Sequence, residues 1–155
     1  MPLTKVIIVS GNGAGDVEQC LYCIFIFLVT AREQIWLPFI QEKLKCDEET
    51  VIIGHSSGAA AAMRYAETHK VFGLILVGAY TSDLGDENER ERVVRYFSRP
   101  WEREQMRRNV GTLFSLASRM TPSCLGRSSK LWPRDTSRTQ FPELIDTVRK
   151  LRVAA

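Results

Sequence analysis

One short stretch constrains the fold of this chain more than any other, VIIGHSSGAAAAMRYAETH, residues 51–69. An apolar run leads into a glycine-flanked turn, and an alanine-rich segment follows it. This order predicts a buried strand, a sharp turn and a helix that ends near residue 69. The GxSxG pattern at the turn is typical of a nucleophile elbow, in which strained backbone angles expose a serine hydroxyl at the carboxyl end of a sheet.

The elbow assigns a separate role to each of its two serines. Ser56 occupies the nucleophile position, and the backbone N–H of Ser57, at the helix N-terminus, is placed to donate to an oxyanion. The alternative is an ordinary strand, turn and helix in which Ser56 or Ser57 caps the helix. The flanking strand and the small-residue helix favour the elbow.

A glycine-rich turn follows an earlier apolar run at residues 6–9, and it reads GNGAG over residues 11–15. In an elbow fold this loop is where a second oxyanion donor is found. Asn12 and Gly13 are therefore candidate oxyanion-loop residues. A phosphate-binding loop is the alternative, but the spacing is not GxGxxG and no Lys-Ser/Thr pair follows.

Apolar runs at 6–9, 51–53 and 71–79 alternate with helical patterns at about 30–44 and 57–69. Continuous apolar strands that alternate with helices predict an α/β fold with a parallel sheet flanked by helices. We therefore expect one small domain over residues 1–155. The first helix should bury one apolar face, made of Ile35, Trp36, Phe39, Ile40 and Leu44.

The second half of the chain is less well patterned. Residues 106–139 are rich in Ser, Thr and Arg, have Asp135 as their only acid, and contain no run that predicts a strand. Residues 141–153, FPELIDTVRKLRV, return to helical spacing. We expect 109–140 to be atypical, either disordered or poorly specified, and the sheet to be incomplete.

Composition excludes several functional classes. The 155 residues carry a net charge of +3, too mild to predict a nucleic-acid partner. The apolar run at residues 20–29, CLYCIFIFLV, is about half the length of a membrane span and predicts a buried strand or helix. Four cysteines at low density predict reduced thiols and a cytoplasmic or nuclear location. Because no second Cys/His pair accompanies Cys20 and Cys23, we expect no metal site, and we expect no cofactor.

A serine nucleophile of ordinary pKa needs a base, and in this fold the order is Ser, Asp or Glu, then His. The chain has two histidines. His55 directly precedes the nucleophile and should point away from it. His69 lies about 20 Å along the following helix at 1.5 Å per residue. Neither is placed to serve Ser56.

Several segments resemble a family of small mammalian serine hydrolases with the α/β-hydrolase fold: VIIVSGNGAGDV, TAREQIWLPFIQEKLKCDEETVIIGHSSGAAAAMRYAETH, LILVGAYTSDLGDENERE, YFSRPWE and FPELIDTVRKL. The resemblance covers roughly two-thirds of the chain. It implies Ser56 as the nucleophile of acyl transfer on small esters, amides or peptides.

The chain departs from the family in two places. Residues 16–30 are shorter than the helix, loop and strand that the family has there. Residues 109–140 lack the family's catalytic aspartate and histidine, and we assign those roles to no residue. The resemblance therefore implies a serine hydrolase of impaired activity, and we interpret 109–140 as an altered reading frame or alternative exon.

A second family feature is Leu44-Lys45-Cys46-Asp47-Glu48, which matches LxCxE, the pattern that retinoblastoma-type pocket proteins recognise. Binding would require Leu44, Cys46 and Glu48 to lie along an extended chain. In the alternative interpretation, Leu44 ends a helix, Cys46 packs in the core and Glu48 belongs to a solvated turn. A non-catalytic interaction protein is thus the second functional hypothesis, and a poorly folding product is the third.

Overall fold

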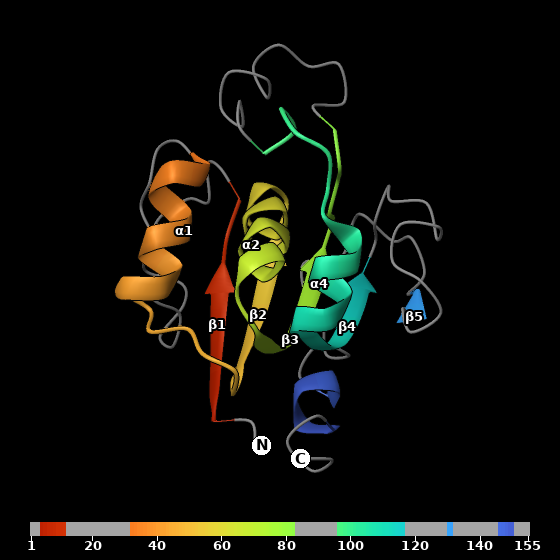
Figure 1. Cartoon of the computed structure of the whole chain (residues 1–155). Coiled ribbons are helices and arrows are strands. Elements are labelled where there is room, and N and C mark those ends of the chain that lie inside the picture. Colours follow the sequence, from red (N-terminus) through yellow and green to blue (C-terminus); the bar gives the residue numbers. More distant parts are fainter. Residues whose placement is uncertain (1–3, 12–31, 83–95, 117–129, 132–145, 151–155) are drawn as a thin grey trace.

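Parallel strands form one sheet in which strand order follows chain order, β1-β2-β3-β4-β5 (Figure 1). The computed structural model describes residues 4–11, 32–82, 96–116, 130–131 and 146–150. The strands are β1 (Lys5–Val9), β2 (Thr50–His55), β3 (Val71–Val77), β4 (Val110–Leu116) and β5 (Lys130–Leu131). The helices are α1 (Glu33–Glu42), α2 (Ser57–Thr68) and α4 (Arg103–Asn109), and residues 146–150 are also helical.

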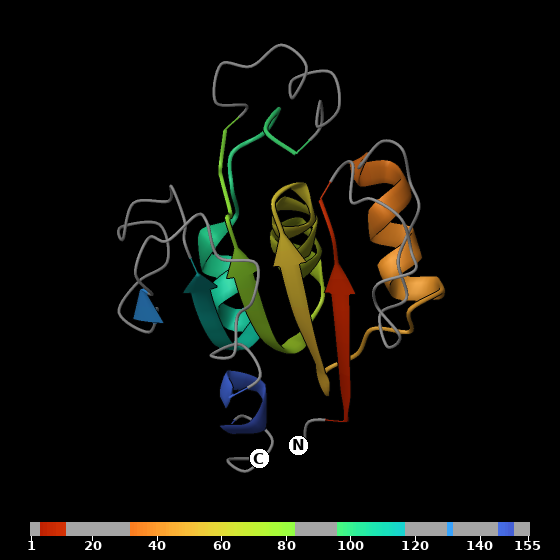
Figure 2. The ribbon, with the colours of Figure 1, turned by 180° about the vertical axis from the view of Figure 1, so that it is seen from behind.

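The labelled helices lie on one face of the sheet (Figure 1), and the view from behind shows the strands in front of them (Figure 2). Crossovers between parallel strands are right-handed, and here each one steps in the same direction along the sheet. The connecting helices therefore lie on the same side of the sheet. Helix α2 sits between α1 and α4 and contacts both. All of its residues except Thr68 are buried.

Alternation along the strands divides the core into two layers. Ile52 of β2 and Leu74 and Leu76 of β3 face the helix layer, where they pack with the alanines of α2. The residues between them face the other side of the sheet, where Val51, Ile53, Ile75 and Val77 form a second cluster that Val148 contacts. The period of two is that of strands buried on both faces.

The α/β class and the first three strands are confirmed, and so is the helix that follows the elbow. The expectation that no strand lies within 106–139 is wrong, because β4 pairs with β3 from Val71↔Val110 to Val77↔Leu116. Its sequence, VGTLFSL, has no β-branched run, so the local pattern does not predict a strand. Hydrogen bonding to the edge of β3 provides the pairing that makes these residues a strand.

Two details of α1 also differ from expectation. The helix ends at Glu42, so Leu44 lies in the following turn, although it is buried as expected. Ile35 is 40% exposed and does not belong to the buried face, which consists of Trp36 and Ile40 with Phe39 half-buried.

Several predicted features lie outside the described residues. These are the apolar run at 20–29 with Cys20 and Cys23, the loop residues Asn12 and Gly13, and Asp135. Within the described segments, no helix is both long and apolar enough to cross a membrane.

Candidate active site

Ser56 forms the turn between β2 and α2 and has an unusual backbone conformation, with φ 55° and ψ −123°. A non-glycine residue rarely adopts a positive φ, and such strain is concentrated at functional sites. Two backbone hydrogen bonds hold the turn in place. The Ser56 N–H donates to the Val77 carbonyl at 2.9 Å, and the Ser56 carbonyl accepts from the Ala59 N–H at 3.0 Å. The Ser56 side chain makes no capping hydrogen bond to α2. The capping alternative is therefore wrong for Ser56.

The glycines on either side of Ser56 allow α2 to approach the sheet. A Cβ at Gly54 would lie 2.6 Å from the Ala59 Cα and 2.7 Å from the Gly58 carbonyl oxygen. A Cβ at Gly58 would overlap the Val9 carbonyl and lie 2.7 Å from the Ser10 oxygen. Helix α2 thus begins directly against the ends of β1 and β2, which fixes the position of Ser56.

The start of the glycine-rich loop lies beside the serine. A Cβ at Gly11 would be 2.8 Å from the Ser56 Cβ and 3.2 Å from its Oγ. The chain after β1 therefore passes the Ser56 hydroxyl as the elbow interpretation requires. Ser57 is the first residue of α2, where the positive end of the helix dipole lies.

The two histidines are separated from each other by the length of α2. His55 ends β2 and is exposed. His69 is the residue after the other end of α2, where its ring stacks on Tyr65 with centroids 4.2 Å apart. The His69 Nδ1 lies 2.8 Å from the Thr68 hydroxyl. The structure therefore does not bring His69 to the elbow, in agreement with the distance expected along the helix.

The LxCxE residues are not displayed together. Leu44 and Cys46 are only 6% and 4% exposed, and both belong to the main core. Lys45 between them has φ 52°, so the chain is not extended there. Glu48 is exposed and lies 3.9 Å from the Lys70 ammonium. Burial raises the pKa of the Cys46 thiol to about 11, so the group is protonated in the folded chain.

Sequence reasoning missed a charged residue in the centre of the fold. Arg64 of α2 is completely buried and forms an ion pair with Glu67 at 2.6 Å. Its guanidinium also donates to three backbone carbonyls ahead of α4, those of Tyr96 (2.9 Å from Nε), Arg99 (2.7 Å) and Pro100 (3.0 Å). Burial lowers the pKa of Arg64, whereas the Glu67 carboxylate opposes that shift. An arginine inside an alanine-rich helix, with a glutamate three residues later, is the signal that could have revealed it.

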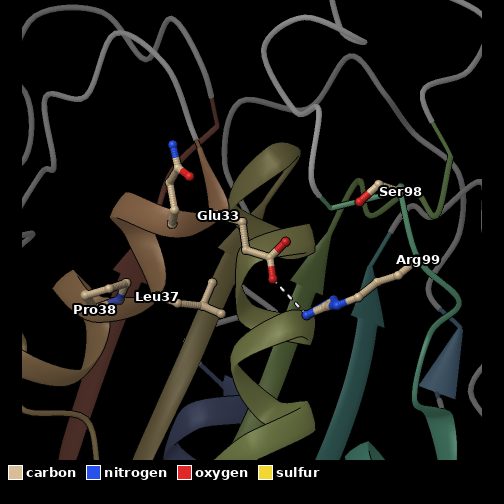
Figure 3. A pocket seen from close by; sticks show the side chains of 6 residues that line it. Glu33, Leu37, Pro38, Ser98 and Arg99 are labelled. Atoms are coloured by element: carbon tan, nitrogen blue, oxygen red, sulfur yellow. Dashed lines mark hydrogen bonds and ion pairs between the residues drawn. The ribbon is translucent and has the colours of Figure 1, made fainter.

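A pocket of about 420 Å³ opens between the first two turns of α1 and the segment before α4 (Figure 3). An ion pair crosses it, in which the Arg99 guanidinium lies 2.7 Å from the Glu33 carboxylate. The lining residues are Glu33, Gln34, Leu37, Pro38, Ser98 and Arg99. Ser56 does not line this pocket, so it is separate from the elbow.

Comparison with known proteins decides the family. A curated rat (Rattus norvegicus) protein, "Serine hydrolase RBBP9", is 52% identical over 137 residues, which cover 77% of this chain and 73% of the relative. This chain belongs to the RBBP9 family of serine hydrolases. A scan against protein-family models gives no match.

A solved structure agrees with the RBBP9 assignment at the level of the fold. It is described as "The crystal structure of the ydeN gene product from B. subtilis" and superimposes with a TM-score of 0.70 over 95% of this chain and 97% of that one. Its sequence identity is 14%, so it supports the α/β-hydrolase-like fold alone. The RBBP9 relationship carries the assignment to serine hydrolases.

Proposed function

We propose that Ser56 is the nucleophile of an acyl-transfer reaction on small esters, amides or peptides. The observation that carries this proposal is the strained Ser56 turn, held between β2 and α2 with the chain at Gly11 beside its hydroxyl. An exposed hydroxyl held at the carboxyl edge of a parallel sheet is what an elbow provides.

In the proposed reaction, the Ser56 Oγ bonds to the substrate carbonyl carbon and the alcohol or amine departs. The oxyanion that forms accepts hydrogen bonds from the Ser57 N–H and from the loop at Asn12 and Gly13. Water then attacks the acyl-serine ester, which releases the acid and restores the hydroxyl. The serine proton passes through solvent water to the leaving group, since His69 lies at the far end of α2 and the proposal assigns no role to His55.

We further propose that turnover is impaired. A triad with its base removed retains oxyanion stabilisation and binding, which leave a rate about 10³- to 10⁴-fold above water. An activated aryl ester is the test substrate, because its leaving group needs no protonation. We expect slow hydrolysis together with an acyl adduct on Ser56 that mass spectrometry detects, absent from Ser56→Ala and retained in Thr68→Ala, an exposed change on the same helix. Turnover at the rate of an ordinary serine hydrolase would refute the impairment, and an acyl adduct that persists in Ser56→Ala would refute the nucleophile.

A second proposed function is binding to a retinoblastoma-type pocket protein through Leu44, Cys46 and Glu48, in the cytoplasm or nucleus. The LxCxE pattern supports it, and the burial of Leu44 and Cys46 means that binding requires the turn after α1 to open. Glu48→Lys removes the motif at an exposed site, and Glu42→Lys makes the same change on the exposed side of α1. In a pull-down, loss of binding in Glu48→Lys alone would support the motif, whereas equal binding by both variants would exclude it.

A further inference from the structure

The Arg64 guanidinium connects α2 to the segment before α4 and, through Trp101, to the chain that follows β3. The Trp101 ring lies over it, 3.7 Å from the Arg64 Cζ to the ring centroid. The Trp101 Nε1 donates to the Thr81 carbonyl at 3.2 Å. Trp101 therefore joins the buried cation to the segment that follows β3.

Aromatic packing strengthens the same connection. The Phe97 ring lies between two others, with its centroid 6.1 Å from that of Trp101 and 5.6 Å from that of Tyr80. Tyr80 is buried, and aromatic pairs at these separations add to the stability that burial provides. The segments 79–82 and 96–101 are thus held together by both a hydrogen bond and ring contacts.

The segment held in this way starts beside the nucleophile. β3 ends at Val77, whose carbonyl accepts the Ser56 N–H, and Thr81 follows four residues later. Figure 1 shows the chain rising from the end of β3 next to the chain that descends to α4, and Figure 2 shows the same pair from behind. Residues 79–82 therefore stand on the β3 side of the elbow.

We propose that Arg64 is a positioning residue of the Ser56 site, an inference that rests on the proposed function. Through Trp101 it fixes residues 79–82 and so sets the room available to the acyl group on the β3 side of Ser56. The guanidinium is suited to this because its planar fork donates to several fixed acceptors at once, in this case the carbonyls of residues 96, 99 and 100. A lysine at the same position retains the charge and the ion pair with Glu67 but cannot reproduce that set of bonds.

The test compares Arg64→Lys with Arg103→Lys, the same change at an exposed position of α4. The readout is the ratio of the rates at which a small ethyl fluorophosphonate and a bulky aryl fluorophosphonate label Ser56. We expect Arg64→Lys to shift this ratio at least tenfold in favour of the bulky reagent and Arg103→Lys to leave it unchanged. A folded Arg64→Lys variant whose melting temperature falls while the ratio stays within twofold of wild type would overturn the inference.

Hydrogen exchange separates this inference from the proposed function. We expect the backbone amides of residues 79–82 to exchange at least tenfold faster in Arg64→Lys than in Arg103→Lys. Trp101→Phe is the second variant, for use if Arg64→Lys does not fold. It keeps the hydrogen bonds of Arg64 but loses the one from the Trp101 indole to the Thr81 carbonyl, and it should speed exchange at residues 79–82 in the same way. If no phosphonate labels wild type, the proposed function fails, and unchanged exchange at 79–82 would independently refute the positioning role.

Discussion

Replacing Gly54 with alanine tests the close approach of α2 to β2 that places Ser56. The added Cβ would lie 2.6 Å from the Ala59 Cα, 2.7 Å from the Gly58 oxygen and 2.9 Å from the Ala59 nitrogen. Non-bonded carbon atoms prefer about 3.5–4.0 Å, so the helix must move by about 1 Å. Each of these atoms belongs to the backbone and cannot rotate away.

The expected cost follows from these distances. Overpacking a close-packed core typically costs about 1–3 kcal/mol, and backbone overlap on several sides places Gly54→Ala near the upper end. Gly73→Ala is the matched control, because its Cβ would meet the Thr112 oxygen at 3.0 Å and other atoms at 3.6 Å. Both variants reduce the freedom of the unfolded chain equally, by about 0.4–1 kcal/mol in favour of folding.

Urea denaturation followed by far-ultraviolet circular dichroism measures the difference directly. We expect the free energy of unfolding of Gly54→Ala to fall at least about 2 kcal/mol below that of Gly73→Ala. Equal stabilities in the two variants would refute the argument that contact between α2 and β2 requires glycine at this position.

Three further changes test the packing around α2. Glu67→Ala should lower the free energy of unfolding by about 3–5 kcal/mol, because it leaves Arg64 buried and without its counterion, whereas Glu104→Ala at an exposed pair should change it by less than about 1 kcal/mol. Similar losses in urea melts would contradict this. Cys46 has its pKa raised from 9.0 to about 11, so the folded chain keeps this proton when the unfolded chain loses it. The free energy of unfolding should therefore fall by up to about 2–3 kcal/mol as the pH rises from 9 to 11, and Cys46→Ala should lack this fall. Parallel pH profiles for the wild type and Cys46→Ala would refute this linkage to Cys46. Asn109→Ala should cost about 1–3 kcal/mol, since the amide donates to two carbonyls near the end of α2, and an unchanged urea midpoint would show that these bonds do not stabilise the chain.

Local sequence patterns predicted the elements whose own residues favour their conformation. The run into Gly54, the turn at Ser56 and the alanines after it each have the sequence that their own conformation requires, and the structure has β2 and α2 there. Strand β3 was equally clear because it is buried on both faces and almost wholly apolar.

The remainder depends on partners that are distant in the sequence. β4 contains glycine, threonine and serine and is a strand because β3 offers it a parallel edge. The burial of Arg64 depends on the carbonyls of residues 96–100, which lie more than 30 positions away and carry no side-chain signal. Ile35 fits the apolar spacing of α1 yet is exposed. Spacing identifies the apolar face of a helix, but how much of that face is buried depends on the elements packed against it.

The central claim is that Ser56 is the nucleophile, and mapping the site of covalent labelling tests it most directly. The chain would be treated with an ethyl fluorophosphonate, digested, and sequenced by mass spectrometry. We expect one phosphonate adduct on Ser56, absent from Ser56→Ala and retained in Ser57→Ala, whose backbone N–H remains. An adduct on another residue, or none under conditions in which the chain is folded, would contradict the account.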